Sequence, residues 1–395
     1  MANALETRTN NIINVLQNIQ HHPGISKPQL CKRCDITAST VQNIVEKLVD
    51  KGAVLSFGQM DSTGGRRARQ YKINQEFKLA VSVSIRLNCA DIAIVNMGLE
   101  ILHHTHMEIR LDSAGPESYT AILVEAIRKL IADNEIQIDR ISGVGVTVPG
   151  PTYFESGTIR EIAGAPLWQD FPLGARLFSA LNLPVWVDKD AFAGLQYLAF
   201  TNQITLDKTT VYITILEGIS AAVMMKGEVF RGSNSLAGEI GHITVRRDGS
   251  RCHCGNTGCL ELYCSDLGII SQYNMQSEGK SQNIDEIIRL AEGGDETAQQ
   301  VFVQAVRYLV DTTCNVIMNY DPNEIVIFCR WLHRQQTLYF SLMDSLYSKS
   351  IFTQRHAVNL RLLEPQNIYL MSAAAAACWQ FLFSRSSPFI IGFDN

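Results

Sequence analysis

The sequence predicts an α/β protein in which an N-terminal winged helix-turn-helix precedes a two-lobed domain of the duplicated actin-like/hexokinase (ribonuclease H-like) type. Residues 1–75 show three short helical patterns followed by a hairpin with a basic tip. Residues 79–148 show three strands, a helix and a buried strand, and residues 210–328 repeat that order. We place the winged helix at 1–76 and the two-lobed domain at 77–395. One lobe is expected at about 77–190 plus the C-terminal helix, and the other at about 191–372.

Length and composition are those of an ordinary globular protein. The 395 residues are enough for two or three domains, and 46% are hydrophobic against 18% charged. The first residues lack the apolar core of a secretory signal, and no apolar run reaches the length of a membrane span. Ten cysteines without regular pairing fit a reducing compartment. These observations predict a cytoplasmic protein that does not contact a membrane.

The net charge of −5 is unevenly distributed. Residues 1–75 hold ten Lys and Arg against five Asp and Glu, whereas the rest of the chain holds 24 against 34. A small basic module on an acidic body suggests that only the N-terminal part contacts a polyanion.

The N-terminal module has the pattern of a helix-turn-helix. Apolar spacing predicts a first helix over 10–20, a second that starts at Ser26 with Pro28 in its first turn, and a third from about 38 to 51. The third would be the recognition helix, and its polar face would contact double-stranded operator DNA. The residues expected on that face are Ser39, Thr40, Gln42, Asn43 and Lys47.

Two strand-like runs, 53–57 and 68–73, flank a Gly-rich basic segment. They predict a β-hairpin wing, in which Arg66, Arg67 and Arg69 are placed for phosphate or minor-groove contacts. The alternative to a winged helix-turn-helix is a three-helix protein-interaction module with a solvated charged loop.

Cys31 and Cys34 form a CxxC pair of the kind that can be redox-active or bind metal, and the sequence leaves both roles open.

A cluster of metal-ligand residue types lies in the second half of the chain. His242, Cys252, Cys254 and Cys259 fall within 18 residues. Three thiols and one imidazole make a closed tetrahedral Zn²⁺ site with no open position for water, so we expect a structural zinc ion. The same loop carries Glu239 and Glu261.

The motif around these residues, ExGH followed by CxCGxxGCxE, resembles that of the ROK family, which contains sugar kinases and sugar-responsive repressors. The resemblance runs from about residue 77 to the end, and the winged helix with its GGRR tip resembles the module that precedes the ROK domain in family repressors. It implies that the His and three Cys hold zinc. It also implies a sugar pocket lined by Asp190, Glu239, His242 and Glu261. Lys189 stands where the family has a sugar-binding Asn, and Asp190 alternatively serves only as a helix N-cap.

The places where family kinases bind ATP depart from the family pattern. The first hairpin, 84–88, reads SIRLN and has lost its carboxylate and both glycines. The second, 216–221, carries Glu217, and the third, 328–331, reads FCRW instead of a glycine run. Because phosphoryl transfer depends on positioning and charge neutralisation at the phosphates, these losses predict a protein that is not an enzyme.

The sequence therefore predicts a transcriptional regulator of carbohydrate metabolism, expected to be a repressor, with an inactive kinase-like domain that senses a sugar or sugar derivative. A lone winged helix reads few base pairs, so a homodimer or homotetramer is expected. Two alternatives stay open. One is an active sugar kinase with an appended DNA-binding domain, and the other is a regulator whose sensor binds a protein partner or no ligand.

Overall fold

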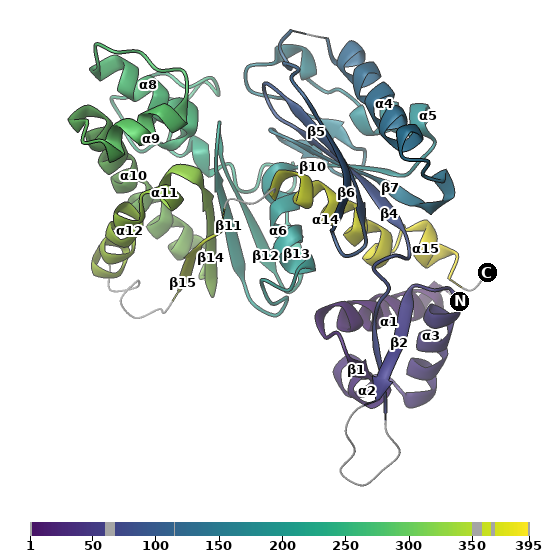
Figure 1. The fold of residues 1–395 in the computed structure, drawn as a ribbon. Helices are drawn as coiled ribbons and strands as arrows, with labels where there is room; N and C mark the ends of the chain where they lie inside the picture. Colours follow the sequence, from purple (N-terminus) through teal and green to yellow (C-terminus); the bar gives the residue numbers. More distant parts are fainter. Residues whose placement is uncertain (1, 60–67, 114, 350–357, 365–367, 394–395) are drawn as a thin grey trace. The chain divides into compact units, whose positions relative to one another are not determined.

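The computed structural model describes residues 2–59, 68–113, 115–349, 358–364 and 368–393. The chain forms two compact units (Figure 1). The first comprises Met1–Gln203 with Tyr369–Asn395, and the second comprises Ile204–Ile368.

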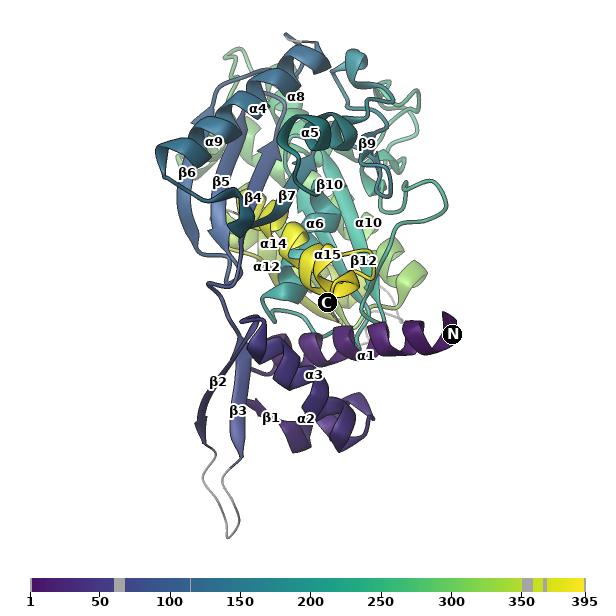
Figure 2. The same cartoon turned by 90° about the vertical axis from the view of Figure 1, so that its right-hand side faces the viewer.

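The predicted winged helix-turn-helix is present in the first unit (Figures 1 and 2). Its elements are α1 (Ala2–His21), β1 (Ile25–Ser26), α2 (Lys27–Cys34), α3 (Ala38–Asp50), β2 (Val54–Gln59) and β3 (Arg69–Ile73). Ser26 precedes α2 as predicted, and its backbone N–H and hydroxyl both donate to Gln29 Oε1, at 2.9 and 2.8 Å. Helix α1 begins well before the predicted residue 10, because its first turns carry no apolar stripe from which the sequence could predict them.

A mixed five-stranded sheet follows in the first unit, in the order β10-β7-β4-β5-β6. Its strands are β4 (Leu79–Ile85), β5 (Ala90–Asn96), β6 (Ile101–Met107), β7 (Ile141–Val148) and β10 (Val185–Lys189). Helices α4 (Pro116–Asp133) and α5 (Leu173–Leu181) pack on one face, and α14 (Ile368–Phe383) packs on the other (Figure 1). The side chains of β6 alternate between half-buried and exposed along its whole length, as expected of an edge strand with one face turned to the core.

The second unit repeats this plan, in the order β13-β12-β11-β14-β15. In both sheets two antiparallel pairings build one edge and two parallel pairings the other. The strands are β11 (Thr210–Ile215), β12 (Ile219–Met225), β13 (Glu228–Phe230), β14 (Glu324–Cys329) and β15 (Asn359–Leu362). Helices α8 (Asp266–Gln276), α9 (Ile284–Glu292), α10 (Glu296–Tyr320), α11 (Arg330–Arg334) and α12 (Gln336–Lys349) contribute to its core. The predicted duplicated actin-like architecture is therefore confirmed.

Aromatic side chains join the winged helix to the C-terminal segment of the same unit. Phe77, which follows β3, packs on Phe381 and on Phe389 of α15 (Pro388–Ile391), with ring centroids 6.2 and 5.5 Å apart. Glu6 on α1 pairs with Arg385 at 3.1 Å. The N-terminal module thus shares a hydrophobic core with α14 and α15.

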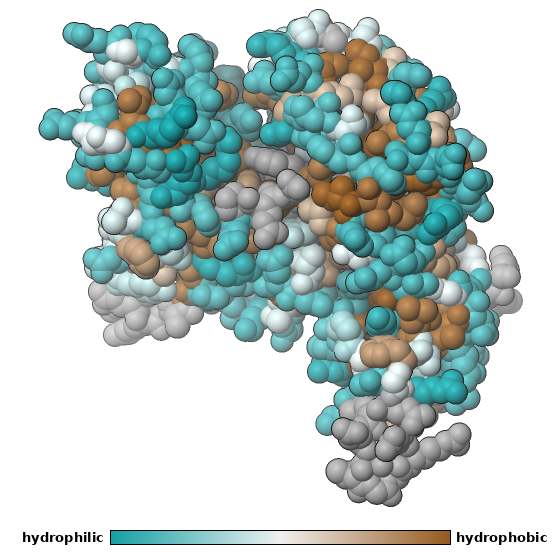
Figure 3. All heavy atoms as spheres, in the orientation of Figure 1, coloured by the Kyte–Doolittle hydropathy of each residue, from teal (hydrophilic) through white to brown (hydrophobic). Residues whose placement is uncertain are grey.

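Hydrophilic side chains predominate on the face of the second unit drawn in Figure 3. Within the described ranges, none of the helices has the length and apolar character needed to cross a bilayer.

Candidate metal centre, ligand site and DNA interface

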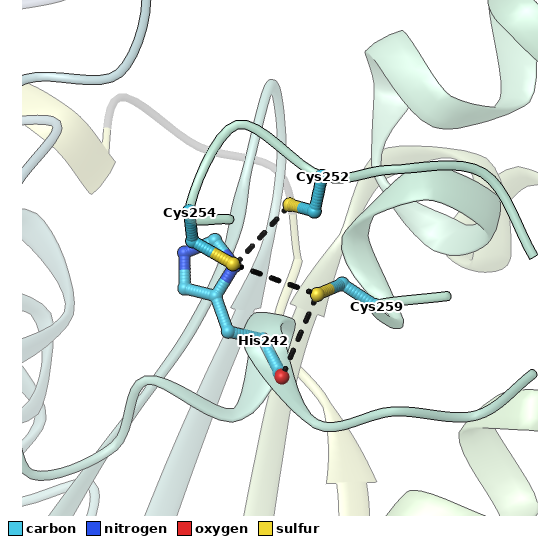
Figure 4. A group of neighbouring side chains, drawn as sticks. All are labelled: His242, Cys252, Cys254 and Cys259. Atoms are coloured by element: carbon cyan, nitrogen blue, oxygen red, sulfur yellow. Dashed lines mark hydrogen bonds between the residues drawn. The ribbon is translucent and has the colours of Figure 1, made fainter. Parts of the chain in front are cut away.

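The predicted zinc ligands come together in one loop of the second unit (Figure 4). His242 ends the 3₁₀ turn Ile240–His242, and the three cysteines follow before α7 (Glu261–Cys264). The His242 nitrogen and the three thiol sulfurs all lie within 4.8 Å of one another. Cys252 and Cys259 are buried, His242 is half-buried and Cys254 is exposed. The structure therefore brings together all four residues that the spacing predicted.

The spacing of these atoms fits a tetrahedral zinc site. A Zn–S bond of about 2.3 Å places two sulfur ligands about 3.8 Å apart, and a sulfur and an imidazole nitrogen about 3.5 Å apart. Cys254 Sγ and Cys259 Sγ are 3.7 Å apart. Cys252 Sγ lies 3.7 Å from His242 Nδ1. These two separations are those expected for ligands of one Zn²⁺ ion, with His242 Nδ1 as the imidazole ligand.

Backbone geometry explains why the loop needs glycine. Gly258 has a φ of +68°, and a Cβ there would lie 1.6 Å from Arg246 O. A tight turn places Cys252 near Cys254, since Gly255 N donates to Cys252 O at 3.0 Å. Apart from short helical turns and two isolated β-bridges, the loop has little regular structure. A bound ion would therefore contribute much of its order.

Two carboxylates flank the cluster. Glu239 Oε2 lies 4.0 Å from His242 Nε2. Glu261 Oε2 accepts from Ile219 N at 3.1 Å, and its Oε1 faces His253 Nε2 at 3.0 Å. Glycine at Gly218 permits this approach, because a Cβ would come within 2.8 Å of Glu261 Oε2.

His253 was not predicted as part of the site. Its ring stands edge-on to that of His242, with centroids 5.0 Å apart. Burial alone would raise the pKa of Glu261, but hydrogen bonds from His253 and the Ile219 amide hold that pKa below its usual range. Glu261 is therefore an ionised acceptor at neutral pH. The only sequence signal for His253 was its place between two metal-ligand cysteines.

Asp190 belongs to the first unit, where it begins α6 (Asp190–Phe200). Its Oδ1 accepts from Ala191 N at 2.6 Å, but Lys189 occupies the N-cap position and no side chain caps the helix, so Asp190 is not the helix N-cap that the sequence offered as an alternative. Its neighbours Asp188 and Lys189 are both buried, and Lys189 Nζ lies 5.6 Å from the Phe192 ring centroid. Because Glu239, His242 and Glu261 lie in the other unit, the four-residue sugar pocket stays a prediction.

The hairpins that would hold ATP phosphates in family kinases carry charged side chains. In the β4–β5 hairpin, Arg86 Nη2 pairs with Asp91 Oδ2 at 2.6 Å. In the β11–β12 turn, Leu216 N donates to Gly218 O at 2.9 Å across Glu217.

After β14 the chain enters α11 at once. Trp331 is fully buried and packs on Phe302, with centroids 5.3 Å apart. Arg330 Nη2 pairs with Asp266 Oδ2 at 2.7 Å, and its Nη1 lies 3.8 Å from Asp285. Burial raises the pKa of Asp266 to about 6, although Arg330 opposes that rise. Bulky and paired side chains thus stand where the family kinases have a glycine run.

The predicted DNA-contact residues on α3 are all exposed or half-buried, so solvent can reach each of them. On α3, Ser39, Gln42 and Asn43 are exposed, and Thr40 and Lys47 are half-buried. The opposite face is buried, through Val41, Ile44, Val45 and Leu48. Thr37 caps the helix by accepting from Thr40 N at 3.3 Å.

In the wing, Arg69 is exposed on β3. Arg66 and Arg67 lie outside the described residues.

Cys34 is buried on α2, and burial raises the pKa of its thiol to about 11, which argues for a role in the hydrophobic core. Among the described residues, the candidate metal-binding groups do not include Cys31 or Cys34.

Comparisons with known proteins agree with this architecture. The ROK family profile matches residues 81–378, and a winged helix-turn-helix DNA-binding profile matches residues 8–54. The xylose repressor of Caldicellulosiruptor bescii is 26% identical over 325 residues, covering 79% of this chain and 81% of that protein.

The regulator NagC of Escherichia coli is 26% identical over 323 residues, covering 79% of this chain and 78% of NagC. A crystal structure described as a ROK family transcriptional regulator, homologous to the E. coli MLC protein, superposes with a TM-score of 0.82. The two sequences are 23% identical, and the superposition covers 98% of each chain. Since the family profile spans most of the sequence and the fold agrees, this chain belongs to the ROK family.

Proposed function

We propose that this protein is a DNA-binding transcriptional regulator of carbohydrate metabolism, and a repressor, whose kinase-like domain senses a sugar or sugar derivative. One observation carries the proposal: a winged helix with an exposed polar face on α3 precedes a ROK domain. The matched relatives named as a xylose repressor and as NagC support it. We infer that it acts in the cytoplasm as a homodimer or homotetramer, because one winged helix reads too few base pairs to specify an operator.

We further propose that His242, Cys252, Cys254 and Cys259 hold a structural Zn²⁺ ion. The separations of the sulfur and nitrogen atoms support this assignment. The ion would fix the loop that presents Glu239 and Glu261 to a ligand. A sugar that binds one conformation of the protein more tightly than the other would then shift operator affinity.

DNA binding should respond differently to changes in α3 and in the wing. Replacing Gln42 or Asn43 by alanine is expected to change base preference by about 1–3 kcal/mol at one position of the operator. The double change Arg66→Ala/Arg67→Ala should instead weaken binding to all sequences and lower the salt slope by about two, because phosphate contacts release counterions. Fluorescence anisotropy over a salt series measures both effects.

The matched control for DNA binding is Lys129→Ala. It removes an exposed lysine of α4 and should leave the salt dependence of operator binding unchanged. Unaltered operator binding after removal of residues 1–75 would show that the winged helix is not the DNA-binding module.

We expect no sugar-dependent ATP turnover. Arg86, Glu217 and Arg330 place charged groups at the three places where phosphates or adenosine would sit. A coupled ADP-release assay over a panel of common hexoses tests this. Turnover above background that disappears in Asp190→Asn would instead support the alternative of an active sugar kinase.

A sugar effector should bind without being phosphorylated. Asp190→Ala and Glu261→Ala are each expected to lower affinity about tenfold or more, because each leaves ligand hydroxyls unpaired. Isothermal titration with sugars and sugar derivatives measures this, and Glu125→Ala on the exposed face of α4 is the control. If both variants bind as wild type does, the effector contacts neither residue, and a protein partner becomes the better hypothesis.

A further inference from the structure

A second group of metal-ligand side chains lies in the first unit. Cys89, Asp91 and His106 each offer one ligand atom, and these atoms lie within 4.8 Å of one another. Asp91 on β5 stands directly opposite His106 on the edge strand β6. Cys89 lies at the end of the β4–β5 hairpin, where its carbonyl accepts from Arg86 N at 2.9 Å. Two paired strands and a tight turn therefore hold the three donors in place.

The carboxylate is at the centre of this group. Asp91 Oδ1 faces His106 Nδ1 at 2.8 Å and His104 Nε2 at 3.1 Å, while Arg86 Nη2 occupies Oδ2 at 2.6 Å. Asp91 itself is 7% exposed, whereas the His104 and His106 side chains are 42% and 46% exposed. An ion could therefore reach the histidines from solvent and meet a carboxylate whose Oδ1 is already aimed at them.

Besides the two histidines, the Asp91 carboxylate has a cationic partner in Arg86. Arg86 neutralises part of the charge and would weaken cation binding. The thiolate that Cys89 forms on metal binding restores a second negative charge to the ligand set.

We propose that Cys89, Asp91 and His106 bind a divalent transition-metal ion of the zinc class. One thiolate, one carboxylate and one imidazole form an N/O/S ligand set that suits Zn²⁺ and Co²⁺ better than Mg²⁺ or Ca²⁺. The bound ion would tie the β4–β5 hairpin to the edge strand β6.

Titration of Co²⁺ into the full-length protein, already loaded with zinc, tests the site. Wild type should take up one further equivalent and develop thiolate-to-cobalt charge-transfer absorption. Cys89→Ser and His106→Gln should each raise the Kd for that equivalent by more than about tenfold. The matched controls are Cys314→Ser, a half-buried cysteine on α10, and His103→Gln, on the other face of β6, and both should bind as wild type does.

A second readout needs no variant. Co²⁺ or Zn²⁺ should protect Cys89 from alkylation, which peptide mapping by mass spectrometry measures. The proposal is wrong if wild type takes up no further equivalent, if neither Cys89→Ser nor His106→Gln changes the Kd, or if Cys89 alkylates equally fast with and without metal. Circular dichroism shows whether each variant is folded. If a variant is unfolded, the alkylation of Cys89 in wild-type protein decides instead.

Discussion

Substituting serine for Cys259 is expected to abolish zinc binding and to lower the free energy of unfolding by more than about 3 kcal/mol. Cys259 is fully buried, and its sulfur lies 3.7 Å from that of Cys254. Serine has nearly the same size, but its hydroxyl is a poor zinc ligand, so the change removes ligation and leaves packing almost intact. The loop between His242 and Glu261 has little regular structure that could keep it ordered without the ion. Elemental analysis and denaturant unfolding measure the two effects.

Cys314→Ser is the matched control for this change, because Cys314 is a half-buried cysteine of the same unit outside the cluster. It should keep one zinc per chain and unfold within about 1 kcal/mol of wild type. Chelation of wild-type protein should reproduce the loss seen with Cys259→Ser. Fully folded wild-type protein without zinc, or a chelator that leaves unfolding unchanged, would refute the structural role of the metal.

The features that the sequence predicted well are local. The four predicted zinc ligands fall within 18 residues, so turn geometry and ligand spacing were enough to group them, and the structure does group them. Helix α3 follows the 3.6-residue period of its apolar positions, and the central strands β4 and β11 coincide with short apolar runs that are buried along their whole length. The duplicated order of strands was visible for the same reason.

The features that the sequence did not predict depend on contacts between distant segments. Arg330 was interpreted only as a bulky replacement for glycine, whereas the structure pairs it with Asp266, 64 residues earlier in the chain. No periodicity relates those positions. Likewise, Asp91 and the histidines of β6 meet only because the two strands pair in that register. The contact between His253 and Glu261 requires the fold of the metal loop, which spacing alone does not determine.

Among the ion pairs of the described part of the second unit, that of Arg330 with Asp266 should be the most costly to break. Replacing Arg330 by leucine is expected to lower the free energy of unfolding by about 2–3 kcal/mol near pH 8, because it leaves a buried carboxylate without its cation, and at that pH protonation of the carboxyl limits the loss to about two pKa units. The loss should shrink toward pH 5. Burial already raises the folded-state pKa of Asp266 to about 6, and removing Arg330 raises it further. Below its folded-state pKa the group is protonated in the folded protein, so the buried charge and its cost disappear. Urea unfolding at pH 5 and pH 8 measures the difference.

Two further variants separate this effect from a general loss of packing. Arg334→Leu removes the neighbouring arginine, whose pair with Glu292 at 2.9 Å is about 40% exposed on both sides, so it should cost less than about 1 kcal/mol at either pH. Adding Asp266→Asn to Arg330→Leu removes the uncompensated charge, and the double variant should be more stable at pH 8 than Arg330→Leu alone. A loss that is equally large at both pH values, and that Asp266→Asn does not relieve, would mean that Arg330 stabilises the turn after β14 through its packing. In that case its charge would be incidental, and the pairing with Asp266 would not explain why a bulky residue stands at this position.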